Sequence, residues 1–326
     1  MRRREFIGLV GGVTAWPIAT RAQSFKKMPR VAVVVVGTQE SSDLIVKPLA
    51  IGLSNLGYED GRNIILRNLL VPPQADQVEA LLIRLVPDID LLIIQGTVGA
   101  VIAKKVVTTL PTVFFAVGDP VRVGVVASLA YPGANFTGIT YEASTESWAK
   151  RIQILGEIVP DLNRVAVLLA AGDPNSDYTM AVLGPLAPAV GVTLVPVYVK
   201  SGDDLESAFD EMKRSRVQGL LVIAGSLTLG NGKRIAELAL AYHMPSCHGF
   251  KETVALGGLV SFGPDFRAIV QQAARIVAKI IKGEKPADIP VEQPTRYEVW
   301  VNLKTAKALG VNIPPTLQAL ADGVIE

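Results

Sequence analysis

The segment RVAVVVVG (residues 30–37) returns 134 positions later as RVAVLLAAG (residues 164–172). Further pairs share this offset: Leu49 with Leu183, Gly57 with Gly191, and Pro111 with Pro245. A single apolar match has little meaning, but several matches at one offset indicate an internal duplication. We therefore expect the chain to contain two similar halves.

Each half alternates unbroken Val/Ile/Leu runs with segments of helical pattern, and such runs are typical of parallel strands covered by helices on both faces. In the first half we expect strands at 31–36, 63–70, 90–95 and 112–117, and helices at 43–56, 75–85 and 98–108. In the second half we expect strands at 165–170, 193–199, 219–224 and near 246, and helices at 177–190, 203–214 and 231–242. The pattern predicts an α/β fold with two doubly wound parallel-sheet (Rossmann-like) lobes.

The first 22 residues, MRRREFIGLVGGVTAWPIATRA, have a basic start, an apolar centre and a small-residue end. This is the anatomy of a secretory signal, and the apolar part is too short to span a bilayer comfortably. The arginines of RRREFI also fit the twin-arginine pattern. We expect residues 1–22 to be a twin-arginine signal peptide that is removed, and the mature protein to be periplasmic.

Net charge and cysteine content limit the partners and the disulfide bonds that we expect for this chain. The sequence has 32 Lys and Arg against 30 Asp and Glu, and the expected signal holds four arginines and one glutamate. The rest of the chain therefore has a net charge near −1, which gives no support to a nucleic-acid partner. Cys247 is the single cysteine, so no internal disulfide can form.

Ligands of open parallel sheets bind beyond the carboxyl ends of the strands, where loops lead into helices. The loops expected there are rich in glycine, hydroxyl and amide groups, which suits recognition of a small molecule. Asp119 or Asp173 can take an ammonium group, and amides after Thr97 can hold a carboxylate. Each position can instead be a cap or turn that never meets a ligand. The candidate ligand-binding residues are Thr38, Gln39, Gly96, Thr97, Asp119, Asp173, Asn175, Ser226, His248 and Phe250.

Catalytic signatures are scarce. The chain has no GxSxG, GxxxxGK[ST] or HExxH motif, and no GxGxxG follows either first strand. His243 and His248 are the only histidines, too few for most histidine-based metal sites. Cys247 and His248 are neighbours on an expected strand and point to opposite faces, so they cannot form a dyad. Trp148 is most simply a packing residue. We expect no catalytic residue, metal or cofactor.

Several long strings carry a wider resemblance. They are RRREFI and AWPIATRAQ near the N-terminus, GLSNLGYEDGRNI (52–64), FFAVGDPVRVGVVASLAYPGANFTGIT (114–140), GGLVSFGPD (257–265) and IIKGEKPADIPVEQPTRYEVWVNLKTAKALGVNIPP (280–315). With these strings the sequence resembles the ABC-transporter substrate-binding proteins of the tryptophan/tyrosine-binding type. That resemblance implies the type I periplasmic-binding-protein fold over essentially the whole chain.

The resemblance also implies a division of the chain into two lobes with a ligand cleft between them. The crossovers would lie near 137–140, 258–262 and 289–296. The first lobe would comprise 28–137 and 262–288, and the second 138–261 and 289–326. The pocket loops of the family map onto Thr38, Gly96, Thr97, Asp119, Asn175, Ser226 and the loop at His248.

The implied function is that of a solute-binding component of an ABC importer. It would capture a small organic ligand (an amino acid, aromatic or carboxylate compound) as the lobes close, and act as a monomer that docks on an inner-membrane permease with its ATPase. Two alternatives use the same two-lobed fold. An effector-sensing gene regulator would need a helix-turn-helix ahead of Arg30, where the expected signal lies. A secreted enzyme would use Asp119 or His248 as acid or base.

Overall fold

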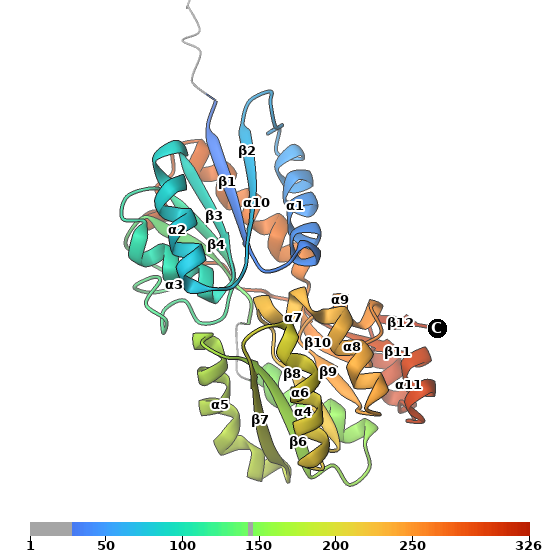
Figure 1. Ribbon diagram of the computed structural model, residues 1–326. Coiled ribbons are helices and arrows are strands. Elements are labelled where there is room, and N and C mark those ends of the chain that lie inside the picture. Colours follow the sequence, from blue (N-terminus) through green and yellow to red (C-terminus); the bar gives the residue numbers. More distant parts are fainter. Residues whose placement is uncertain (1–27, 143–145) are drawn as a thin grey trace, which may run out of the picture.

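The computed structural model describes residues 28–142 and 146–326, so the expected signal peptide at 1–22 lies outside the described residues. Two α/β lobes stand end to end, and the chain passes between them at three crossovers (Figure 1). The predicted fold class, two parallel-sheet lobes, is confirmed. No helix in the described ranges is long and apolar enough to cross a membrane.

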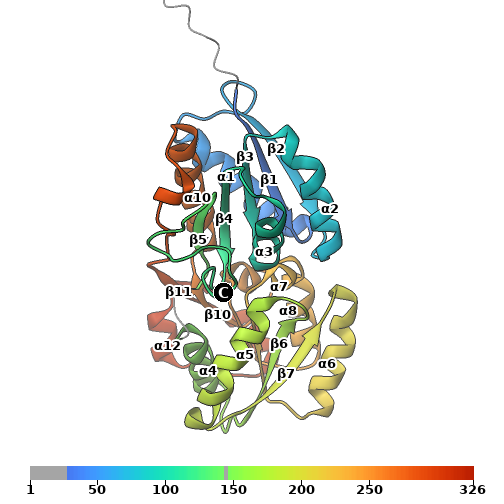
Figure 2. The ribbon, with the colours of Figure 1, turned by 90° about the vertical axis from the view of Figure 1, so that its left-hand side faces the viewer.

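The first lobe has a five-stranded parallel sheet in the order β2-β1-β3-β4-β5. Its strands are β1 (Arg30–Val36), β2 (Ile65–Val71), β3 (Leu91–Gln95), β4 (Thr112–Val117) and β5 (Phe136–Thr140). Its helices are α1 (Gln39–Ser54), α2 (Ala75–Leu85), α3 (Thr97–Val106) and α10 (Phe266–Ile281). Helices α1 and α10 cover one face and α2 and α3 the other, as Figure 2 shows.

The apolar run of β1 explains this layered arrangement. Because successive side chains of a strand point to opposite faces, Val31, Val33 and Val35 pack in the core under α1 and α10. Ala32 and Val34 pack in the core under α2 and α3. An unbroken apolar strand is therefore required by two buried faces, and removal of its apolar surface from water stabilises the lobe.

The second lobe has a seven-stranded sheet in the order β12-β11-β10-β9-β8-β6-β7, parallel except for the β10–β11 pair. Its strands are β6 (Arg164–Ala170), β7 (Thr193–Val199), β8 (Gly219–Val222), β9 (Ser246–His248), β10 (Val260–Pro264), β11 (Tyr297–Asn302) and β12 (Gly323–Ile325). Its helices are α4 (Glu146–Ile158), α5 (Pro174–Leu186), α6 (Leu205–Arg214), α7 (Ser226–Gly230), α8 (Gly232–Ala241), α9 (Lys251–Ala255), α11 (Leu303–Leu309) and α12 (Pro315–Leu320).

The places where the chain changes lobe are set by sheet membership. Strand β5 pairs with β4 and so belongs to the first lobe, and β10 pairs with β9 and β11 in the second. Ile289 and Val291 pack in the cores of the first lobe, and Glu292 bridges to Ile139. We therefore assign 28–142 and 265–292 to the first lobe and 146–264 and 293–326 to the second. These boundaries differ from the sequence-based ones by a few residues.

Candidate ligand-binding site

The edges of the two lobes that face each other across the cleft, here called the rims, are in contact. Gln95, the last residue of β3, donates from Nε2 to Oγ of Ser226, the first residue of α7, over 3.2 Å. Thr38 shares the single proton of Oγ1 between Oε2 of Glu40, at 2.7 Å, and the carbonyl oxygen of Gly230 in the second lobe, at 3.1 Å. The bonds to Ser226 and Gly230 join one lobe to the other, so the cleft is closed in this structure.

Glycine is required where the rims approach most closely. Gly96 has φ +81°, a conformation that residues with a Cβ rarely adopt, and a Cβ there would lie 2.5 Å from Oγ of Ser226. A Cβ on Gly118, in the loop after β4, would overlap the side-chain amide of Asn175 in the second lobe. Gly118 lacks a positive φ, so at this position the close approach itself excludes a side chain.

The contact zone between these rims holds almost no space. Gly96, Thr97, Ser226 and Phe250 line a gap of about 10 Å³, which is at the lower limit for a single water molecule. The hydroxyl of Thr97 already has a hydrogen-bond partner there, because its Oγ1 accepts from the backbone N–H of Gly118 over 3.1 Å. These four sequence-predicted residues therefore lie together in this contact zone, which we call the seam. The closed structure leaves no room for an organic ligand there.

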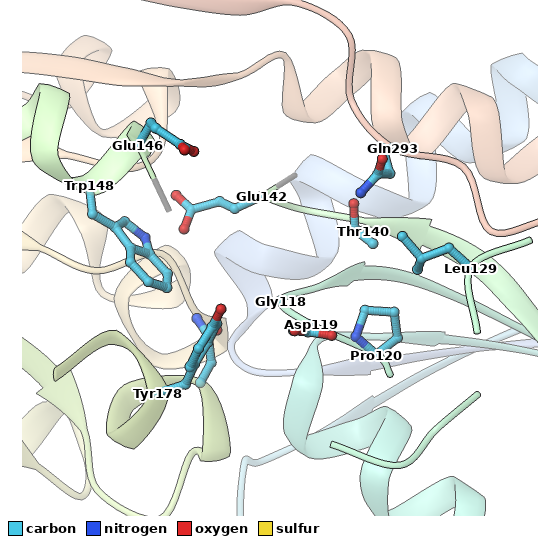
Figure 3. Close-up of a pocket in the computed structure, with 11 residues that line it drawn as sticks. Gly118, Asp119, Pro120, Leu129, Thr140, Glu142, Glu146, Trp148, Tyr178 and Gln293 are labelled. Carbon is cyan, nitrogen blue, oxygen red and sulfur yellow. The ribbon is translucent and has the colours of Figure 1, made fainter. Parts of the chain in front are cut away.

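A much larger cavity, of about 390 Å³, opens beside the seam (Figure 3). The loop after β4 and strand β5 form its first-lobe side, and the first turns of α4 and α5 form its second-lobe side. Its lining residues are Gly118, Asp119, Pro120, Leu129, Thr140, Glu142, Glu146, Trp148, Asn175, Tyr178 and Gln293. Since both lobes contribute to its wall, the cavity is complete only when the cleft is closed.

Three buried polar atoms in this wall have no hydrogen-bond partner among the described residues. They are Oγ1 of Thr140, Oε2 of Glu142 and Nε1 of Trp148. Buried polar groups are nearly always paired, because an unpaired one loses its bonds to water without replacement. One carboxylate acceptor, one indole donor and one hydroxyl that can do either thus belong to residues that line a single cavity, as a site built for a polar ligand would require.

The cavity combines aromatic rings with negative charge. The rings of Trp148 and Tyr178 meet edge to face, with centroids 5.6 Å apart. The guanidinium of Arg122, from the first lobe, lies 4.2 Å from the centre of the Tyr178 ring. Three carboxylates and no lysine or arginine are among the described residues that line the cavity. This wall favours a ligand with a flat or apolar body and a positively charged donor group.

Glu142 is held in the wall by a buried ion pair. Nη2 of Arg151, on α4, donates to its Oε1, and both side chains are almost fully buried. In Figure 3 the Glu142 side chain extends toward Trp148 and Glu146. Burial has the largest single effect on the pKa of the Arg151 guanidinium and lowers it, but Glu142, Tyr141 and Cys247 together raise this pKa above its ordinary value. The guanidinium of Arg151 is therefore charged.

Asp119 and Asn175 are the two sequence-predicted residues that line the large cavity. Asp119 also caps its own turn, because Oδ1 accepts hydrogen bonds from the backbone N–H groups of Val121 and Arg122. Asp119 is therefore a cap that also lines the cavity, and its contact with a ligand stays a prediction. Asn175 begins the face of α5 that continues, three residues on, with Tyr178.

Asp173 lies on another side of the seam. It caps α5 by accepting a hydrogen bond from the backbone N–H of Asn175, and it lines a smaller cavity of about 210 Å³ with Lys200. Burial raises the pKa of its carboxyl to about 6, and the charge of Asp177 adds to the rise. Asp173 is therefore separate from the large cavity.

Three further candidates lie outside the large cavity. Gln39 is exposed and donates to Asp43 on its own helix. Thr38 belongs to the rim, as described above. His248 is buried within the second lobe, where Nε2 lies 2.9 Å from Oγ of Ser246, and burial lowers its pKa to about 3. Among the described residues no group of His, Cys, Asp or Glu is arranged to hold a metal ion.

Sequence reasoning missed most of the cavity wall. Thr140, Glu142 and Trp148 lie at or just after the first crossover, which no strand-end rule points to. Trp148 was interpreted as a packing residue, and it is buried, but it also lines the cavity, and its indole N–H has no hydrogen-bond partner among the described residues. Tyr178 could have been found, because residues three apart on a helix share a face and it follows Asn175 at that spacing.

The fold and the interlobe cavity define a class, the two-lobed binding proteins, and comparison with known proteins specifies the family. The family described as ABC transporter substrate binding protein matches residues 30–325. The chain therefore belongs to that family. It is a solute-binding component of an ABC transporter that acts outside the cytoplasm and not an enzyme, so both alternative functions considered from the sequence are set aside.

Three relatives show the extent of the similarity. The tyrosine-binding protein of Clostridioides difficile (strain R20291) is 23% identical over 285 residues, which cover 87% of this chain and 81% of the relative. A conserved domain protein from Vibrio cholerae is 25% identical, with a TM-score of 0.85 over 91% of this chain and 100% of its own. An ABC domain from Streptococcus pneumoniae in complex with L-Trp is 23% identical, with a TM-score of 0.82 over 91% and 99%.

Proposed function

We propose that the chain binds an amino acid with an aromatic or other large apolar side chain, in the 390 Å³ cavity between its lobes. The observation that carries this proposal is the set of three buried polar atoms, without a partner among the described residues, on side chains that line this cavity. A zwitterion offers both a donor for a carboxylate and an acceptor for an indole N–H and a hydroxyl. The known relatives support it, since one is a tyrosine-binding protein and another holds L-Trp.

Each part of such a ligand finds a matching group in the wall. Its ammonium group would bind Oε2 of Glu142, and its carboxylate would accept from Nε1 of Trp148 and Oγ1 of Thr140. Its side chain would lie against Tyr178 and Leu129. The volume supports this size class, because small-molecule pockets usually measure about 300–1,000 Å³.

Closure of the lobes would trap the ligand and mark the protein as loaded. Only the closed form brings the α4 and α5 side of the cavity against the β4 loop and β5. Binding energy realised only in that form shifts the population toward it. We propose that the closed protein then docks on an inner-membrane permease driven by its ATPase. We further propose that it does so as a periplasmic monomer, after removal of residues 1–22.

The experiment is a ligand screen by thermal shift and isothermal titration with L-tryptophan, L-tyrosine, L-phenylalanine and L-leucine. A ligand that binds only the folded protein raises Tm, and the rise grows as the ligand concentration exceeds Kd. Trp148→Phe keeps a ring but removes the indole N–H, so it should weaken binding by about 2- to 12-fold. Trp300→Phe is the matched control, because Trp300 lies on β11 and donates to Glu298 away from the cavity. If none of the four amino acids binds, the proposal fails.

A further inference from the structure

Arg151 is the largest fully buried side chain in the described part of the chain. A buried guanidinium requires partners for its charge and its N–H groups. Nη2 donates to Oε1 of Glu142, and Nε donates to the backbone oxygen of Phe262 over 2.6 Å. Glu142 lies on the first crossover, and Phe262 lies on the strand that leads to the second. One side chain therefore joins two of the three connections between the lobes.

The third connection between the lobes also contacts Phe262. The ring of Phe262 stacks on that of Tyr297, with centroids 5.5 Å apart and planes at 30°. Tyr297 is the first residue of β11, where the chain enters the second lobe for the last time. Arg151 thus occupies the point at which the three crossovers come together, directly behind one wall of the ligand cavity.

The two oxygens of Glu142 have different surroundings. Oε1 is bound to Arg151, whereas Oε2 is buried without a partner among the described residues. The side chain is 5% exposed and lines the cavity. An ionised carboxylate can only accept hydrogen bonds, so whatever satisfies Oε2 must be a donor. The carboxylates of Asp119 and Glu146 line the same cavity, which favours a cationic donor over a neutral one.

We propose that Arg151 is a positioning residue for ligand recognition: it fixes Glu142 so that Oε2 accepts a hydrogen bond from a protonated amine of the ligand. It also holds Phe262, so that the amine site and the crossovers keep one geometry. This inference rests on the proposed binding of a ligand in the 390 Å³ cavity and adds the group that must be present in that ligand. It assigns a function to a side chain that itself contacts no ligand.

The geometry requires arginine at this position. A guanidinium presents several N–H donors in a fixed plane, so one side chain can hold a carboxylate and a carbonyl in set directions. A lysine keeps the positive charge but presents it as a single point on a flexible stem. Arg151→Lys therefore separates the charge from the geometry, and it is the informative substitution.

The test measures how strongly an amino group contributes to binding. The probes are L-tryptophan, L-tyrosine and L-phenylalanine, the matching acids without the amino group (indole-3-propionate, 3-(4-hydroxyphenyl)propionate and 3-phenylpropionate), and the matching amines without the carboxyl group (tryptamine, tyramine and phenethylamine). Isothermal titration gives Kd for each probe. A charge-assisted hydrogen bond predicts that amino-bearing probes bind wild type about 10- to 150-fold more tightly than the acids.

The Kd of each acid divided by the Kd of the matching amino-bearing probe is the ratio to follow. Three variants test whether this ratio depends on Arg151 and Glu142. Arg151→Lys and Glu142→Gln should reduce it to nearly one. The double variant with Glu142→Leu and Arg151→Met replaces the buried ion pair by apolar groups, a change that proteins often tolerate, and it should abolish the ratio in a folded protein. Ile154→Val, a buried position on the same helix that does not line the cavity, controls for stability and should keep the wild-type ratio.

The outcomes separate this inference from the proposed function. If an amino acid binds and Arg151→Lys lowers Tm while the ratio stays at its wild-type value, Arg151 is only structural and the inference fails while the function stands. If only the amines bind and the ratio depends on Arg151 and Glu142, the inference stands and the amino-acid proposal fails. If no amino-bearing probe binds wild type, both fail.

Discussion

Gln95 and Ser226, 131 residues apart in the sequence, are hydrogen-bonded across the cleft with Nε2 of Gln95 3.2 Å from Oγ of Ser226. Both side chains are buried, with 2% and 5% of their surface exposed. This bond exists only when the lobes are closed, because its donor ends a strand of one sheet and its acceptor begins a helix of the other lobe. It therefore contributes to the closed form and not to the folding of either lobe.

Ser226→Ala should weaken ligand binding without reducing the stability of the unliganded lobes. Loss of one buried hydrogen bond costs about 0.5–1.5 kcal/mol, so Kd should rise about 2- to 12-fold. Isothermal titration measures this change, and small-angle scattering reports whether the unliganded protein expands. Ser207→Ala is the control, because Ser207 bonds to a backbone carbonyl within the second lobe. An unchanged Kd in Ser226→Ala would contradict a role in closure.

Gly118→Ala should hold the lobes apart. The new methyl group would overlap the amide of Asn175 in the closed form only, and the backbone at Gly118 can accept alanine. The expected result is a larger radius of gyration by scattering in the presence of ligand, with an almost normal Tm for the unliganded protein. Asn175→Ala in the same chain removes the overlap and should restore compaction. If Gly118→Ala compacts like wild type, the rims do not meet as described.

Arg151→Met should lower the free energy of unfolding by about 3–5 kcal/mol, because it leaves Glu142 as a buried charge without a partner. Adding Glu142→Leu removes that charge and should recover most of the loss. Chemical denaturation of the two variants and of wild type measures both effects. Recovery of less than about 1 kcal/mol would mean that the destabilisation comes from lost packing and not from the unpaired charge.

Asp173 makes stability depend on pH in a defined direction. Its folded pKa, about 6, is above the unfolded value near 3.8. The contribution of this carboxyl is therefore favourable below pH 3.8 and is lost as the pH rises through 6. Asp173→Asn removes the buried charge and keeps a side chain that can cap α5. It should stabilise the protein by about 2–3 kcal/mol at pH 7.5 and by nearly nothing at pH 4. Equal effects at both pH values would contradict this account.

The fold could be predicted from the sequence because local patterns decide it. The run at 112–117 was predicted to be a strand, and β4 spans those residues. A short apolar stretch between Pro111 and Gly118 favours a buried strand over other secondary structure. The helix expected from residue 43 begins earlier, at Gln39. Thr38 and Glu40 start its first turn with a hydrogen bond between their side chains, a local contact that apolar periodicity does not reveal.

The candidate site was harder to predict because it depends on the angle between the lobes. The strand-end loops were located correctly, but Gly96, Thr97 and Ser226 in these loops lie together at the seam. The ligand space lies to one side, and residues such as Glu142 and Trp148 reach it from the first crossover. Their positions follow from how two separately folded lobes dock, and no periodicity within either half encodes that relationship.

The most direct measurement is a crystal structure of the protein grown with the amino acid that binds most tightly in the screen. We expect ligand density in the cavity lined by Trp148 and Tyr178, with the amino nitrogen within hydrogen-bond distance of Oε2 of Glu142. Density for the ligand beside Asp173 and Lys200, or anywhere outside the 390 Å³ cavity, would contradict this expectation.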